Sequence, residues 1–203
     1  MILYVWWHNM YAQSEAGLEQ YSYISKGSFR INPILWYQFK SGWYAEGRYN
    51  YEADNTLSVY VGRTFQKEST ISYAISTLAG IVTGQFNGGA IATNADFEYK
   101  RLFLSIQSQY AVSIKDRSEN YLYNWVDLGC TATPWLSVGL SMQLTNGYKA
   151  KPLIEKGFFI NASYGKLSFP IYIYNPGSAE AYNIVGINYA WRFKGKNLKK
   201  KAD

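Results

Sequence analysis

The sequence has little that supports disulfide, metal or imidazole chemistry. Cysteine occurs once, as Cys130, and histidine once, as His8. An intrachain disulfide and a cysteine-rich metal site are therefore excluded, and we expect neither a metal nor a cofactor. No uninterrupted apolar run of about 18 residues follows the N-terminus, which excludes a helical membrane protein.

Charged residues are also scarce, at 17% of the chain, whereas aromatic residues reach 18% and tyrosine alone occupies 20 positions. Hydrophobic residues make up 48%, yet the mean hydropathy is slightly negative at -0.24. Short runs rich in aromatic and branched residues are typical of a soluble β-sandwich or barrel, or of a membrane barrel with aromatic girdles. The distribution of polarity along each run distinguishes these classes.

Polar and apolar residues alternate in segments of roughly ten residues, the length of a membrane-spanning strand. In 43–52, Trp43, Tyr49 and Tyr51 fall on an apolar face, while Glu46 and Arg48 fall on the opposite face. The same pattern predicts an antiparallel up-and-down transmembrane barrel of about 12 strands, with 10 as the alternative. The expected strands are 17–24, 29–39, 43–52, 56–66, 71–82, 90–99, 102–113, 121–132, 136–145, 157–164, 167–174 and 182–193.

The links between these segments alternate in length. Tight links such as 40–42 and 100–101 alternate with longer ones such as 115–120 and 146–155. Membrane barrels show this asymmetry, with short turns at one rim and longer loops at the other. We therefore expect an even number of strands and both ends of the barrel domain at the same rim.

A soluble barrel or sandwich is the alternative, since its strands alternate too but bury the apolar face. Aromatic residues here gather near the strand ends of the apolar face, as membrane-interface girdles require. The opposite face is rich in Gly, Ser, Gln and Asn, which suits a wet interior. Both features favour the membrane barrel, and the expected interface aromatics are Trp43, Tyr110, Tyr189, Trp191 and Phe193.

The segment 186–193, GINYAWRF, resembles the C-terminal insertion signal of bacterial outer-membrane β-barrel proteins, in which aromatics alternate up to a final Phe. The resemblance implies a location in the bacterial outer membrane, with outer-membrane lipid and the barrel-assembly machinery as partners. The sequence departs from it because residues 194–203 follow Phe193.

The chain divides into three parts. Residues 1–13 are apolar and end in Ala-Gln, which predicts either a truncated signal peptide or an N-terminal strand. Residues 14–193 form the single barrel domain, and 194–203 form a basic tail. Because no aromatic residues are interleaved with the tail lysines, we expect a solvated terminus and no nucleic-acid partner.

Strand parity places charges of both signs inside the barrel. One interpretation is a narrow channel for ions or small hydrophilic solutes, because lining charge and width set pore selectivity. The alternative is a non-transporting structural or interaction barrel whose lumen is filled by paired charges. The predicted lumen-lining residues are Arg30, Glu46, Arg48, Glu52, Asp96, Glu98, Asp127 and Arg192.

Enzymatic activity is not expected. Outer-membrane phospholipases, lipid A deacylases and palmitoyltransferases, and barrel proteases resemble one another in using a His as base or proton carrier. The single His8 lies in the segment 1–13. Asp96 and Glu98 lie two apart on one strand face, and we interpret them as lumen charges rather than as an acid/base pair.

Overall fold

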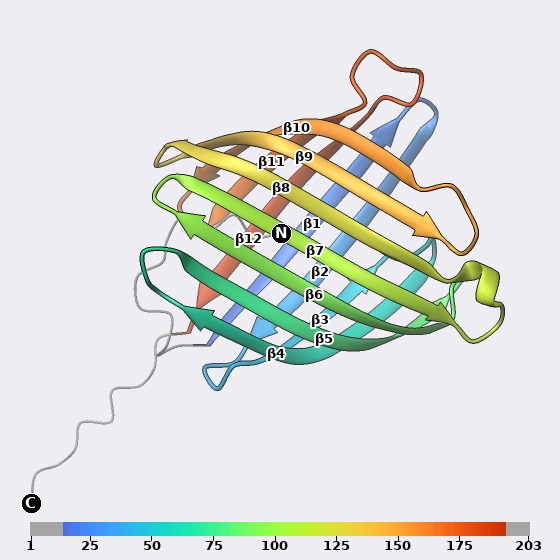
Figure 1. Cartoon of the computed structure of the whole chain (residues 1–203). Helices are drawn as coiled ribbons and strands as arrows, with labels where there is room; N and C mark the ends of the chain where they lie inside the picture. The colour runs from blue at the N-terminus through green and yellow to red at the C-terminus, as the bar shows by residue number, and fades with distance from the viewer. Residues whose placement is uncertain (1–13, 194–203) are drawn as a thin grey trace, which may run out of the picture.

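The computed structural model describes residues 14–193, which form a closed barrel of twelve antiparallel strands (Figure 1). The predicted 1–13 segment and basic tail lie outside the described residues. Among these residues, no helix has the length and apolar character needed to cross a membrane. The strands are β1 (Glu15–Ser25), β2 (Ser28–Gln38), β3 (Trp43–Tyr49), β4 (Thr56–Lys67), β5 (Ser72–Gly84), β6 (Gly88–Tyr99), β7 (Leu102–Ser113), β8 (Tyr121–Thr133), β9 (Leu136–Gly147), β10 (Leu153–Tyr164), β11 (Leu167–Tyr174) and β12 (Tyr182–Arg192).

Each strand pairs with its sequence neighbours, and β1 pairs with β12 to close the barrel. At this seam Glu15 lies opposite Arg192, so the start of β1 and the end of β12 meet at one rim. The predicted up-and-down fold and even strand number are confirmed. Several boundaries differ by a few residues. The largest differences are that β3 ends at Tyr49 instead of 52 and that β10 begins at Leu153 instead of 157, and β9 also extends into the expected 146–155 loop.

The two rims differ in the length of their connections. We call the rim that holds the strand ends at Glu15 and Arg192 the turn rim, and the opposite rim the loop rim. The 26–27 link is a tight turn at the loop rim, where Gly27 has a φ of 80°. The turn rim carries 39–42, 68–71, 100–101, 134–135 and 165–166, and the loop rim carries 26–27, 50–55, 85–87, 114–120 with its 3-10 helix, 148–152 and 175–181 (Figure 1).

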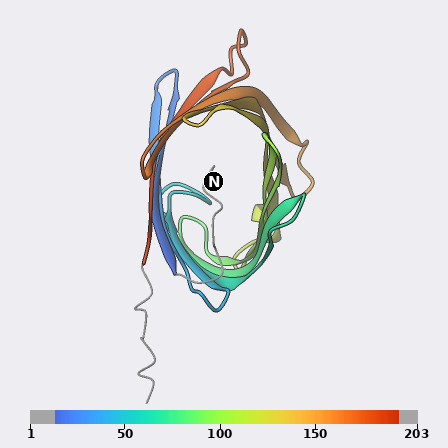
Figure 2. The ribbon, with the colours of Figure 1, turned by 90° about the vertical axis from the view of Figure 1, so that its left-hand side faces the viewer.

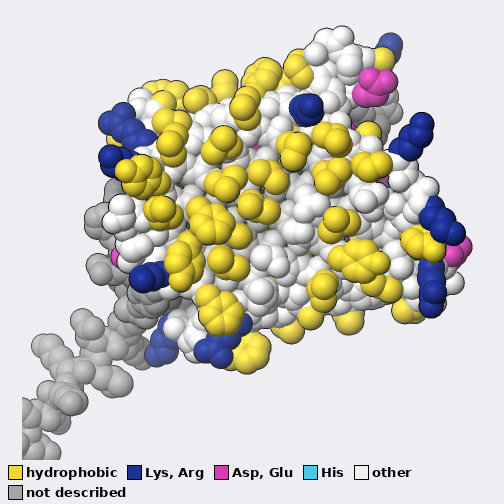
Figure 3. All heavy atoms as spheres, viewed as in Figure 1, with side chains coloured by type: hydrophobic (Ala, Val, Ile, Leu, Met, Phe, Trp, Pro, Cys, Tyr) yellow, Lys and Arg dark blue, Asp and Glu magenta, His cyan; other side chains and the backbone are white. Residues whose placement is uncertain are grey.

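The outer wall of the barrel is apolar between its rims. In β9, Leu140 is 66% exposed, while its neighbours Ser141 and Gln143 point inward and are buried. Hydrophobic side chains cover the wall in Figure 3, and lysines and arginines gather toward its two edges. A wall of this kind suits a hydrocarbon layer bounded by polar headgroups. Other exposed apolar side chains include Leu18, Ile31, Leu35, Leu57, Val59, Val61, Ile81, Ile91, Leu128, Ile160, Ile171 and Ile187.

The expected interface aromatics lie on the outer surface near the strand ends. Trp43 and Phe193 are exposed at the turn rim, and Tyr110 is exposed toward the loop rim. Trp191 is half-buried and packs between Tyr189 and Phe193, with ring centroids 5.6 and 6.2 Å away. The outer surface thus carries aromatic rings toward both rims.

We expect Leu140→Arg to destabilise the refolded barrel by about 2–4 kcal/mol, because it places a charge in the middle of the lipid-facing wall. Gln143→Arg on the same strand should cost much less. Its side chain would face the lumen opposite Glu155, the directly paired residue on β10. Denaturant unfolding in lipid bilayers measures both free energies, and equal penalties would show that the two faces are assigned wrongly.

Candidate functional site

Residues 14–193 enclose a cavity toward each rim. The loop-side cavity has a volume of about 940 Å³ and reaches Ser25 and Asn55 at the loop rim. The turn-side cavity has a volume of about 180 Å³ and reaches Glu15 and Arg192 at the turn rim. Between them lies a set of buried side chains, which we call the central layer. Its members are Glu46, Arg48, Tyr51, Glu52, Tyr60 and Gln109.

Arg48 on β3 is the centre of this layer and is 4% exposed. Its Nε donates to Oε1 of Glu46 at 2.8 Å, and its Nη2 also bonds that oxygen. Its Nη1 donates to Oε1 of Gln109 at 2.7 Å and lies 3.9 Å from Oε1 of Glu52. The guanidinium is thereby held by two carboxylates, as a buried charge requires. Since Gln109 lies on β7, the bond also crosses the lumen.

Two tyrosine rings pack against the same guanidinium. The rings of Tyr51 and Tyr60 each have their centroid 4.4 Å from Cζ of Arg48, a cation–π geometry. The Tyr60 hydroxyl donates to Glu52 at 2.7 Å, and the Tyr51 hydroxyl donates to Gln107 at 2.7 Å. Every member of the layer except Glu46, which bonds Tyr44 and Arg48 of its own strand, therefore has a partner on another strand or loop.

The position of Tyr51 corrects the sequence prediction, which placed it on the lipid face. Strand β3 ends because Asn50 adopts a φ of 58°, and Asn55 closes the loop with a φ of 51°. The Asn50 amide donates to the carbonyl of Ile31 at 3.0 Å and its Oδ1 accepts from the backbone of Asn55 at 2.8 Å. Loop 50–55 thus turns inward, and loops curl inside the oval ring of strands in Figure 2. Asn50 and Asn55 were the sequence signal for the end of the strand and the turn of the loop, since Asn tolerates positive φ.

Glycines on neighbouring strands make room for the inward aromatic rings. A Cβ built on Gly80 would lie 2.4 Å from the ring of Tyr60, its directly paired residue on β4. The same pairing of a ring with a glycine occurs at three other places in the wall. These pairs are Trp36 with Gly17, Phe103 with Gly129, and Tyr21 with Gly186.

Asp127 on β8 lies in a second buried cluster and is 0% exposed. Its carboxylate accepts from Trp125 Nε1 at 2.9 Å, from the Ser141 hydroxyl at 2.5 Å and from the Tyr172 hydroxyl at 3.1 Å. Within residues 14–193, no arginine or lysine forms an ion pair with it. The ring of Tyr21 on β1 packs edge-on against Trp125 at 5.8 Å, so this cluster also crosses the barrel. Sequence reasoning placed Asp127 in the lumen but missed the aromatic donors around it.

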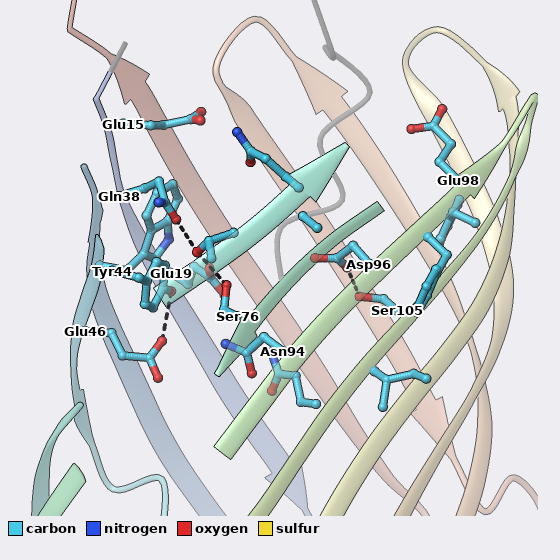
Figure 4. Close-up of a pocket in the computed structure, with 18 of the residues that line it drawn as sticks. Glu15, Glu19, Gln38, Tyr44, Glu46, Ser76, Asn94, Asp96, Glu98 and Ser105 are labelled. Atoms are coloured by element: carbon cyan, nitrogen blue, oxygen red, sulfur yellow. Dashed lines mark hydrogen bonds between the residues drawn. The ribbon is translucent and has the colours of Figure 1, made fainter. Parts of the chain in front are cut away.

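The turn-side cavity is rich in carboxylates (Figure 4). Glu15 accepts from Nε of Arg192 at 3.4 Å across the β1–β12 seam. Asp96 accepts a hydrogen bond from Ser105, and Glu98 lies nearer the turn rim on the same strand. Figure 4 shows Glu15 on one wall of this space and Asp96 and Glu98 on the opposite wall. Five carboxylates line it, namely Glu15, Glu19, Glu46, Asp96 and Glu98, together with Arg48 and Arg192.

The loop-side cavity is lined by tyrosines and fewer charges. Arg30 on β2 pairs with Asp54 of loop 50–55 at 3.4 Å, and its guanidinium lies 4.9 Å from the ring centroid of Tyr23. Glu52 and Glu155 are the other charged residues of the lining. The tyrosines that line this cavity are Tyr23, Tyr51, Tyr121, Tyr123 and Tyr182.

The eight predicted lumen residues therefore occupy different parts of the interior. Only three, Glu46, Arg48 and Glu52, contact one another directly through an ion-pair network. In the part of the chain that the structure describes, no group of three or more His, Cys, Asp or Glu is arranged to hold a metal ion. The remaining five are Asp96, Glu98 and Arg192 at the turn-side cavity, Arg30 at the loop-side cavity, and Asp127 in the aromatic cluster.

Comparison with protein-family models and with curated proteins gives no match to this sequence. Comparison with solved structures finds similar folds. A KdgM porin matches with a TM-score of 0.65 at 10% identity, covering 86% of this chain and 99% of that one. A KdgM porin in complex with disordered oligogalacturonate matches with a TM-score of 0.63 at 10% identity, with the same coverage. A NanC porin matches with a TM-score of 0.58 at 12% identity, covering 89% of this chain and all of that one. The chain therefore has the porin-like barrel fold of bacterial outer-membrane proteins.

We expect Gly80→Ala to destabilise the barrel by about 1–3 kcal/mol, because the new methyl group would overlap the Tyr60 ring. That ring cannot shift freely, since its hydroxyl bonds Glu52 and its face packs on Arg48. The control is Gly47→Ala, where the nearest atom would be 3.9 Å from the new Cβ. Denaturant midpoints of the refolded variants provide the comparison. A Gly80 variant as stable as the Gly47 variant would contradict this account of the wall.

Proposed function

We propose that this protein is a narrow outer-membrane channel for ions or small hydrophilic solutes. The observation that carries the proposal is the arrangement of two cavities lined by charged side chains, one reaching each rim, inside a closed barrel. The larger cavity lies within the range of about 300–1,000 Å³ that holds small ligands. The proposal assigns the lumen carboxylates to solute passage rather than to catalysis.

The comparisons support this class of function. The similar structures are porins, and one of them is described in complex with an oligogalacturonate, a hydrophilic solute. The apolar outer wall and its aromatic rims support a position in the outer membrane. Sequence identities of 10–12% indicate a shared fold but do not identify a solute. The class of solute has to be argued from the residues that line the lumen of this chain.

The central layer determines how wide the path is. Arg48 and Glu46 are buried, and Tyr51 closes the layer from the loop 50–55. Tyr51 lies on a loop, its hydroxyl makes one hydrogen bond, and its ring contacts Arg48 and Tyr123. Because no strand holds its backbone, it is the aromatic member of the layer that is more easily displaced. We propose that it forms the constriction between the two cavities.

A second candidate function is favoured by the same layer. Arg48 pairs with Glu46 and Glu52 and also bonds Gln109 across the lumen, as expected of a non-transporting structural or interaction barrel. Such a barrel would keep both cavities as separate pockets. Ion conductance distinguishes the two candidates because it requires a continuous path of water.

We expect the refolded wild type to conduct in planar bilayers, and Tyr51→Ala to increase the unit conductance because the side chain leaves the constriction. The control is Tyr148→Ala, which removes an exposed ring in the loop 148–152 outside the lumen. It should conduct like the wild type. Long recordings without openings from the wild type and the Tyr51 variant would favour the structural barrel.

A further inference from the structure

The lumen and the whole chain carry opposite formal charges. The chain has a formal net charge of +6. Five carboxylates and two arginines line the turn-side cavity, which leaves a formal charge of -3. Three carboxylates and one arginine line the loop-side cavity, which leaves -2, and among residues 14–193 no lysine lines either one. The described lining of both cavities is therefore net acidic, and its basic groups are Arg30, Arg48 and Arg192.

The ring faces inside the barrel already contact cations. Both tyrosines beside Arg48 present their faces to its guanidinium at 4.4 Å, and Tyr23 in the loop-side cavity lies 4.9 Å from that of Arg30. Aromatic faces attract cations because the ring quadrupole is negative above the plane. The five tyrosines of the loop-side cavity thus suit a cationic solute better than an anionic one.

A carboxylate in the same cavity provides a charged contact for a solute. Gln143 on β9 and Glu155 on β10 are directly paired across the strands, and both line the cavity. Gln143 is buried at 3% exposure, whereas Glu155 is half-buried, so the carboxylate is the accessible member of the pair. Glu155 thereby supplies a negative charge to the lining.

We infer that the loop-side cavity binds solutes of net positive charge that carry a guanidinium group. The guanidinium lies among the tyrosine rings and Glu155. The inference rests on the proposed channel function, because it names the class of solute that the channel admits. The turn-side cavity, with its own negative charge, then favours passage of the same cations toward the other rim.

The test compares L-arginine with L-citrulline, which has the same shape but an uncharged side chain. Isothermal titration calorimetry of the full-length barrel refolded in detergent measures both affinities. We expect arginine to bind roughly tenfold more tightly than citrulline, as one cation–π and charge contact would give. Glu155→Gln should reduce this preference to roughly threefold or less.

The matched control is Glu180→Gln, the same chemical change at an exposed carboxylate of the loop 175–181 that does not line the cavity. It should leave the preference unchanged. Equal affinities for arginine and citrulline in the wild type would overturn the inference, whatever the folding of the variants. Equal effects of the two glutamate substitutions would overturn it too.

Binding in detergent does not require an open path, so the two proposals fail separately. Arginine binding by a barrel that never conducts would support the cation site and overturn the channel function. Conductance by a barrel without preference for arginine would support the channel function and overturn the cation site.

Discussion

The structure depends on the burial of one guanidinium group in the middle of a closed barrel. A charge removed from water is costly unless opposite charges and hydrogen bonds surround it. Arg48 satisfies this requirement with Glu46 of its own strand, Glu52 of loop 50–55 and Gln109 across the lumen. The loop must therefore turn inward, and the ring of Tyr60 must lie flat against the wall. One buried cation thus organises a loop, three strands and the division of the lumen into two cavities.

Much of the fold could be predicted because alternation along a strand is a local property. The exposure of Leu140 beside the buried Ser141 repeats the pattern read from the sequence, and twelve such segments close into one barrel. Parity also points Arg48 inward. Parity fails where a strand stops, and Tyr51 lies one residue beyond the left-handed turn at Asn50 that ends β3. The alternation of polar and apolar residues continues through residue 52, although the extended backbone ends at Tyr49.

The partners of the lumen charges could not be predicted either, and the reason differs from the one that applies to Tyr51. Gln109 meets Arg48, and Trp125 meets Tyr21, only because the closed ring brings strands far apart in sequence to face each other. Those distances depend on the tilt and stagger of all twelve strands together. Asp127 shows the result: it is buried without an ion pair among the described residues, and neutral donors from three strands surround it. No local pattern distinguishes this aspartate from one that is paired with an arginine.

The seam between β1 and β12 has a consequence for how the chain folds. Glu15 and Arg192 are partners although 177 positions separate them. The contact between β1 and β12 therefore closes a loop that contains almost the entire domain. Ordering so long a segment before any seam hydrogen bond forms is entropically unfavourable, and non-local pairing of this kind slows folding. Until closure, β1 and β12 both present unpaired backbone groups, which in lipid have no water to satisfy them. We therefore expect closure of the seam to be a late and cooperative step of folding.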